Sequence, residues 1–412
     1  MQTESVGEAL VSPAAPTRGR RDVAGVIVAM VSAAIAPFLV GTLSVQIGAS
    51  FEFGAGDLAV AVAGYYLVSA VLSPAGGRLV GALGAVPTLR LACLGSTAGL
   101  GLAATADSAS TIVIALGLLG VPNALVQPAS NQVLATVRSP RLQALSFGLV
   151  QSAIPIATLI SGVLLGLVGA SSSWRAALVS VVVFTALGQL VIGADREKKR
   201  QVTQQAASSI AAEPGGRLLL TALVVGGLLA TMAAATLPAF VAATGQANGV
   251  GPHAVAAAQI AGSMACITAR VAITWRAAHL EGFQLLFAMA GLLALGAVGY
   301  LLVGNEAALV FGAGVVLAYG CGWGWNGVFN LSLTRARPRG IARATGLTQA
   351  GVFLGGVLGP LMFAAAVHRQ GHGAAWGSMA VVAVTASVLL AVGAFHWQRV
   401  PSLRTEYEER SP

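Results

Sequence analysis

Long apolar runs recur along almost the whole chain. Each run holds about 18 or more residues between charges or turn residues, the length and pattern of a helix that crosses a lipid bilayer. Twelve such spans are predicted, at about 23–48, 57–80, 88–106, 110–137, 142–168, 174–193, 217–243, 253–275, 282–303, 307–333, 343–367 and 374–397. The polar segment 194–216 is the longest connection, and it divides the chain into six spans and six.

The composition also places the chain in lipid. Of 412 residues, 56% are hydrophobic and 9% are charged, where a soluble protein carries about 25% charged residues. The mean hydropathy is +0.81. The predicted fold is an all-α polytopic membrane protein with twelve transmembrane helices in two six-helix bundles, 23–193 and 217–397. A disordered tail over 1–22, a linker over 194–216 and a second tail over 398–412 complete the predicted organisation.

The positive charges predict which side of the membrane each connection faces, because Lys and Arg are retained on the cytoplasmic side of short loops. With both termini and the linker in the cytoplasm, the only two of 23 cations on the outer side are Arg175 and Arg369. The outer side receives the acidic residues Glu52, Asp57, Asp107 and Glu306. The pI of about 10.3 then follows from topology and anionic lipid, and no nucleic-acid partner is predicted.

The choice of cation indicates the origin of the chain. Arg outnumbers Lys by 21 to 2, and Ala and Gly are abundant, which is typical of a GC-rich bacterial genome. The predicted location is therefore the bacterial inner membrane, crossed many times.

Two short elements recur at an offset of 198 residues. The sequence GLVQS at 148–152 matches GLTQA at 346–350, and the Pro-Arg pair at 140–141 matches the pair at 338–339. Both elements take the same place in their halves, which indicates a duplication. An even number of spans per half gives both copies the same orientation. Parallel halves of this kind occur in the major facilitator superfamily of transporters.

The connection after the second span resembles the signature of that superfamily, G-x-L-x-D-R-x-G-R-R. Gly77, Leu79 and Gly84 match it, whereas Gly81 stands at the Asp position. The stretch 269–279 resembles the second-half copy, with Ala278 where the Asp is expected. In the family, that Asp helps to latch the two halves near the cytoplasmic face. The resemblance, which covers about residues 23–397, implies a gating role for Gly77, Arg78, Gly84 and Arg270.

Polar side chains inside the spans mark candidate substrate-binding positions, since an unpaired polar group in hydrocarbon is costly. In span four they recur at four-residue spacing on one face of the helix: Asn123, Gln127 and Asn131. In span ten they recur at spacings of three and four, with an aromatic residue one turn earlier: Tyr319, Trp323, Asn326 and Asn330. The resemblance implies that both spans line a central cavity.

Gln151 and Gln349 form a second candidate pair for substrate binding. Each lies roughly ten residues into its span, or ~15 Å from the inner end. In a pseudo-twofold fold the two side chains are expected to oppose each other across the cavity. The alternative is that such amides tie neighbouring helices together. Weaker candidates are Tyr65, Tyr66 and Ser69 in span two and Gln259 and Ser263 in span eight.

Charges inside the spans are rare. Arg270 is the only cation well inside an apolar run, and it is expected to extend toward the inner surface or pair with backbone carbonyls, with anion binding as the alternative. No acidic residue lies at mid-depth in a span. Glu52 and Asp57 are therefore the groups available for proton coupling; otherwise the carrier is a uniporter or couples through its substrate. Enzyme motifs and metal-ligand spacings are absent from the sequence.

These observations predict a secondary active transporter that moves a small organic solute by alternating access, without a cofactor. Amides, a hydroxyl and aromatic rings favour an uncharged or weakly charged, partly apolar solute, and efflux of a drug-like compound or secondary metabolite is favoured. The alternatives are an uptake permease for a small organic acid or nutrient, and a non-cycling, transporter-like sensor or scaffold. The expected partners are the solute and membrane lipid, and the protein is expected to be a monomer.

Overall fold

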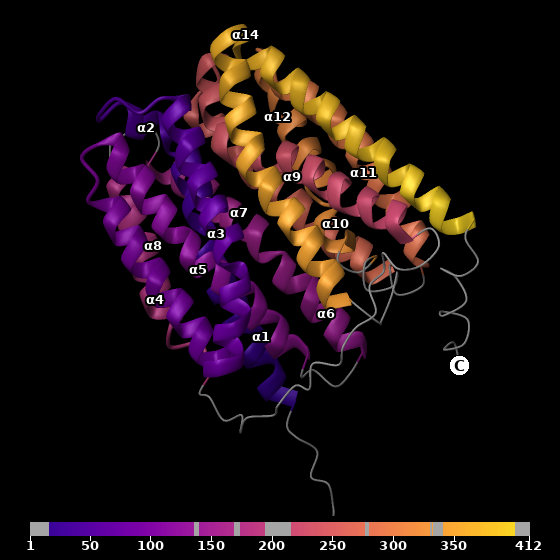
Figure 1. The fold of residues 1–412 in the computed structure, drawn as a ribbon. Helices are drawn as coiled ribbons and strands as arrows, with labels where there is room; N and C mark the ends of the chain where they lie inside the picture. Colours follow the sequence, from indigo (N-terminus) through magenta and orange to yellow (C-terminus); the bar gives the residue numbers. More distant parts are fainter. Residues whose placement is uncertain are drawn as a thin grey trace, which may run out of the picture.

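The computed structural model describes residues 16–135, 140–168, 174–193, 216–276, 280–329, 332 and 341–399. These residues form helices and turns, and no strand occurs among them. Ten helical stretches among the described residues, two of which run across neighbouring elements, are long and apolar enough to cross a membrane. The predicted all-α membrane class is confirmed. In Figure 1 the N-terminal half, drawn from indigo to magenta, lies beside the C-terminal half, which runs to yellow.

The N-terminal half begins earlier and turns more tightly than the sequence predicted. Its helices are α1 (Pro16–Thr42), α2 (Ser44–Gly48), α3 (Ala55–Leu83), α4 (Ala85–Ala104), α5 (Ala109–Ala135), α6 (Pro140–Gln151), α7 (Ala153–Val168) and α8 (Trp174–Gly188). Residues 16–22, part of the predicted tail, are helical; proline suits the first position of a helix because its missing N–H is not needed there. The signature region belongs to α3 as far as Leu83, and Gly84 turns the chain with φ +94°, a conformation that glycine adopts readily.

The fifth predicted span is divided into two helices. α6 ends at Gln151 and α7 begins at Ala153. Pro155 accounts for the break, because it has no N–H to donate to the carbonyl four residues earlier, which belongs to Gln151. The Gln151 carbonyl oxygen is thereby left available to another donor.

The C-terminal half contains two irregular spans. Its elements are α9 (Gly216–Ala247), α10 (Pro252–Arg276), α11 (Gly282–Val303), α12 (Ala308–Leu317), the π-helix η3 (Ala318–Gly322) and α14 (Ile341–Arg399). α14 covers the last two predicted spans and is interrupted at Gly371, where φ is +83°. α8 has only 15 residues. The count of twelve spans therefore stays a prediction.

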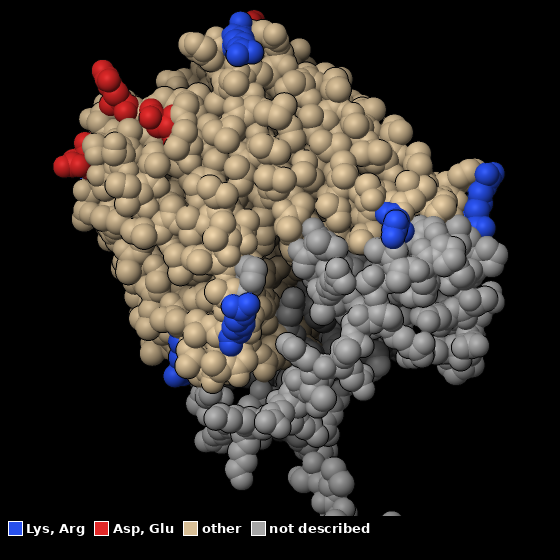
Figure 2. Space-filling view, in the orientation of Figure 1, with Lys and Arg blue, Asp and Glu red and all other residues tan. Residues whose placement is uncertain are grey.

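The described charges gather at the two ends of the molecule. Here the end that carries α2 is termed outer and the opposite end inner, following the predicted orientation. Figure 2 shows the acidic side chains near the outer end, and most of the described Lys and Arg side chains toward the other end. The band between them is uncharged on the visible face, as a surface in contact with lipid requires.

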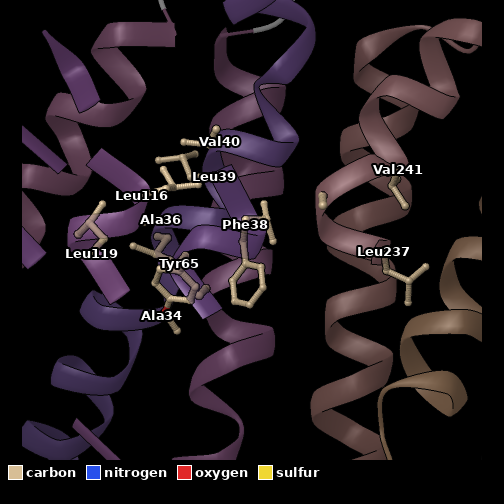
Figure 3. Packing of buried hydrophobic residues seen from close by; sticks show 14 of the residues in the cluster. Ala34, Ala36, Phe38, Leu39, Val40, Tyr65, Leu116, Leu119, Leu237 and Val241 are labelled. Atoms are coloured by element: carbon tan, nitrogen blue, oxygen red, sulfur yellow. The ribbon is translucent and has the colours of Figure 1, made fainter. Parts of the chain in front are cut away.

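Apolar packing joins the two halves. The larger hydrophobic cluster includes Phe38 and Leu116 of the N-terminal half together with Leu237 and Val241 of α9 (Figure 3). The smaller cluster belongs to the C-terminal half alone, with Leu219, Trp325 and Leu390 among its members. The shared core is tightest at the outer end of α1, where a Cβ on Gly41 would lie 2.6 Å from the Ala239 Cα. Only glycine permits this approach without a shift of backbone.

Candidate functional site

One face of α10 carries polar residues that meet the N-terminal half. Gln259, Ser263 and Arg270 are spaced by four and seven residues, so they share a helix face. α10 packs against α7 and α6, and the polar side chains bond across this contact. The resulting polar interface is termed the seam, and it consists of Thr42, Gln151, Thr158, Gln259, Ser263 and Arg270.

The outer level of the seam is neutral. The Gln259 amide donates to the Thr42 hydroxyl at 2.8 Å and to the Thr158 carbonyl oxygen at 3.1 Å. The hydroxyls of Thr158 and Ser263 lie 2.8 Å apart. All four side chains are fully buried. These hydrogen bonds tie α10 to α1 and α7 without placing a charge between the halves.

The inner level of the seam contains a charge. Arg270 lies ~16 Å farther along α10 and is 0% exposed. Its Nη1 donates to the Gln151 carbonyl oxygen of the other half, and its Nη2 donates to the Trp323 carbonyl oxygen at 3.1 Å. The predicted pairing with backbone carbonyls is confirmed. The predicted extension toward the inner surface is wrong, because the carbonyls hold the guanidinium inside the protein.

Both acceptors of Arg270 lie where a helix is irregular. Gln151 ends α6, four residues before Pro155. Trp323 directly follows the π-helix η3. Irregular turns interrupt the regular i to i−4 hydrogen bonds and often occur at functional sites. The sequence thus opens two carbonyls to the only cation buried at this depth in the described spans.

Aromatic rings surround the Arg270 contact. The Trp323 ring lies 5.5 Å from Phe38 of α1 and 5.6 Å from Tyr319, between ring centroids, and 5.7 Å from the Arg270 Cζ. Tyr319 is fully buried. Its hydroxyl and the Arg270 Nε have no hydrogen-bond partner among the described residues, although the Cys266 thiol lies beside the guanidinium. Two buried donors next to an aromatic wall are the features of a recognition site.

The polar residues predicted on one face of span four differ in their contacts. The Asn123 amide donates to the Ser69 hydroxyl at 2.9 Å, and that hydroxyl bonds the Gly120 carbonyl at 3.1 Å. Asn123 therefore ties α5 to α3 within one half. Gln127 is half-buried, and its Oε1 has no partner among the described residues. The side chain of Asn131 lies outside the described residues.

The remaining predicted substrate-binding residues are only partly placed. Asn326 and Gln349 are half-buried, whereas Gln151 is 8% exposed. Asn330 lies outside the described residues. The proposed opposition of Gln151 and Gln349 across a cavity stays a prediction.

Apart from the buried Arg270, the predicted gating and proton-coupling residues lie toward the helix ends, and the gating role of all four residues stays a prediction. Gly77 and Arg78 are exposed near the inner end of α3. Glu52 is exposed between α2 and α3, and the Asp57 carboxylate accepts a hydrogen bond from the Gly54 N–H at 2.9 Å. That bond stabilises the start of α3. A role of either acid in proton coupling stays a prediction.

Sequence reasoning missed part of the seam. Thr42 and Thr158 were not singled out, and Gln259 and Ser263 ranked as weaker candidates. The available signal was the shared helix face of Gln259, Ser263 and Arg270. Thr42 also lines a cavity of about 300 Å³ between the outer ends of the halves, together with Gln46, Ser50, Gln246 and Val255.

Two packed halves of membrane-spanning helices with a buried polar interface are the architecture of a membrane transport protein. The sequence profile of the Major Facilitator Superfamily matches residues 23–360, and the chain belongs to this superfamily. The crystal structure of the human organic anion transporter MFSD10 (TETRAN) is similar in fold, with a TM-score of 0.68 and 17% sequence identity over 92% of this chain and 100% of that chain. No curated protein sequence matches. The protein is a multi-pass membrane transporter.

Proposed function

We propose that this chain is a secondary active transporter that moves a small organic solute across the bacterial inner membrane by alternating access. The observation that carries the proposal is the seam, where a few polar contacts join two halves that have their own internal bonds. Tyr65, for example, donates to the Ala33 carbonyl at 3.0 Å within the N-terminal half. The halves are thus suited to move as units, with both termini in the cytoplasm.

The two levels of the seam support two discrete arrangements. Separation at the outer end breaks the Gln259 bonds and the close contact of Gly41 with Ala239. Separation at the inner level breaks the bond between Arg270 and Gln151. Alternating access requires such alternative contact sets, since a rigid-body motion exchanges one for the other. Both contact sets lie within one chain, so a monomer in lipid is sufficient for the proposed motion.

The aromatic residues beside Arg270 support a partly apolar solute. Phe38, Tyr319 and Trp323 offer rings for stacking, and buried polar atoms beside them offer directional contacts. Export of a drug-like compound or secondary metabolite suits these aromatic and polar groups better than uptake of a strongly hydrated nutrient.

Distances between spin labels test the proposed motion. One pair, Asp107→Cys with Glu306→Cys, reports the outer end, and a second pair, Leu83→Cys with Arg399→Cys, reports the inner end, after replacement of the native cysteines. All four sites are exposed. Double electron resonance is expected to show two populations, with the outer distance lengthening as the inner one shortens. A single distance in each pair that no solute changes identifies a non-cycling sensor or scaffold.

Counterflow in proteoliposomes tests the predicted glutamine pair. The double variant Gln151→Ala, Gln349→Ala is expected to exchange a cognate solute at least about tenfold more slowly, as the loss of two polar contacts implies. If this variant exchanges the solute at the wild-type rate, the two glutamines do not bind the substrate, although the proposed transport function still holds.

A further inference from the structure

We propose that Arg270 is the binding group for a carboxylate of the transported solute, and that this carboxylate takes the place of the Gln151 carbonyl oxygen at Nη1. The inference rests on the proposed transport function. It replaces the uncharged or weakly charged solute that the sequence favours with a partly apolar organic anion.

The charge of Arg270 has no acidic partner. None of the 14 acidic residues of the chain lies at mid-depth in a predicted span, and among the described residues no ion pair involves Arg270. Two carbonyl oxygens solvate the guanidinium but do not neutralise it. A buried cation without a counter-ion is costly. An anionic ligand supplies the missing charge.

The Gln151 carbonyl is the exchangeable partner. It belongs to the opposite half from Arg270, so relative motion of the halves breaks this bond, whereas the bond to Trp323 lies within one half. Pro155 has no N–H to reclaim the carbonyl. A carboxylate forms a stronger, charge-assisted hydrogen bond with Arg than a neutral carbonyl does. It is therefore able to displace Gln151 from Nη1.

Two further donors are poised for the same anion. The Arg270 Nε and the Tyr319 hydroxyl are buried without a hydrogen-bond partner among the described residues. Both side chains adjoin the Trp323 ring, which also meets Phe38 across the seam. Together these groups fit a carboxylate attached to an aromatic or other flat apolar body.

Displacement of Gln151 couples binding to motion. A ligand shifts a conformational equilibrium only by its different affinity for the two states. In the closed inner level, Nη1 is occupied by Gln151; in the open level, it is free. A carboxylate thus favours the state in which the halves have separated at Arg270.

Binding of matched acids and amides to the purified full chain tests the proposal. The probes are benzoate, 2-naphthoate and indole-3-acetate, each compared with its primary amide by calorimetry. Wild type is expected to bind at least one acid about tenfold more tightly than its amide, as one charge-assisted bond implies. Arg270→Gln is expected to abolish that preference. Arg276→Gln is the matched control, because Arg276 lies on the same helix and is exposed.

Three results overturn the proposal: no acid binds, acids and amides bind equally, or Arg270→Gln keeps the preference. Folding of the variant is checked by its elution volume and thermal unfolding.

Pro155→Ala tests the role of Gln151 separately. Alanine supplies an N–H that bonds the Gln151 carbonyl within the helix, so Arg270 loses its competitor. The carboxylate is expected to bind about threefold to tenfold more tightly than to wild type. Unchanged affinity contradicts the exchange of Gln151 for the anion. If the spin-label distances change while no acid preference exists, only this inference fails; if they never change, the proposed transport fails as well.

Discussion

The outer and inner levels of the seam join the same two halves by different chemistry. At the outer level, neutral side chains bond one another, with Gln259 donating to the Thr42 hydroxyl and to the Thr158 carbonyl. At the inner level, a guanidinium bonds only backbone carbonyls, and its Nε is unused among the described residues. The outer level also contains one unpartnered buried atom, the Gln259 Oε1, but it carries no charge and therefore suits closure. A charged level that lacks a counter-ion suits recognition.

Two helix irregularities lie at the inner level of the seam. The break between α6 and α7 and the π-helix η3 both adjoin Arg270. Lipid offers no water to an open carbonyl, so such a break persists only where another donor fills it. Arg270 supplies that donor to both irregular turns.

The largest effect is expected from crowding the outer level. Gly41→Ala places a Cβ 2.6 Å from the Ala239 Cα, so the helices must separate, at a cost of up to about 3 kcal/mol. We expect a lower unfolding temperature and a longer distance between labels at Asp107 and Glu306.

Gly117→Ala is the control for this substitution. A Cβ at Gly117 meets no atom within 4 Å, and alanine is the better helix former by about 0.5–1 kcal/mol. This variant is expected to be slightly more stable than wild type. Equal destabilisation by both changes means that the close approach of α1 and α9 does not hold the outer end.

A smaller effect is expected from deleting the outer amide. Gln259→Leu removes two hydrogen bonds between the halves, worth about 2 kcal/mol together. The outer spin-label distance is expected to lengthen, and the preference for 2-naphthoate over its amide is expected to persist, since Arg270 is untouched. Gln189→Leu serves as control, because Gln189 bonds the Arg90 carbonyl inside one half. If Gln259→Leu loses the preference for the acid, Gln259 and Arg270 act as one binding site, and the division into two levels is wrong.

The smallest effect is expected within a half. Asn123→Ala removes the bond to Ser69 and lowers stability by about 1 kcal/mol. Neither pair of spin-label distances changes, and 2-naphthoate affinity stays at the wild-type value. If the affinity changes and the unfolding temperature does not, Asn123 contributes to substrate binding and does not act only in helix packing.

The spacing of apolar and charged residues along the chain predicts where helices lie, but not exactly where they end. Hydrophobic runs gave the membrane class and most helix positions, and the isolation of Arg270 predicted its carbonyl partners. The merging of the signature region into α3 was missed, because its proline, glycines and charge (Pro74, Gly76, Gly77 and Arg78) are typical of a connection. The exact break at Gln151 was also missed.

The sequence by itself determined that this chain belongs in lipid, that it is helical, and that its interior holds one cation and no acid. Those properties follow from local composition and periodicity, which need no knowledge of neighbouring helices. Only the tertiary structure decided which polar groups meet. Gln259 reaches a residue 217 positions away, and Arg270 reaches one 119 positions away. Periodicity fixes the face of a helix on which a residue lies, but the packing of the two halves selects the partner opposite that face.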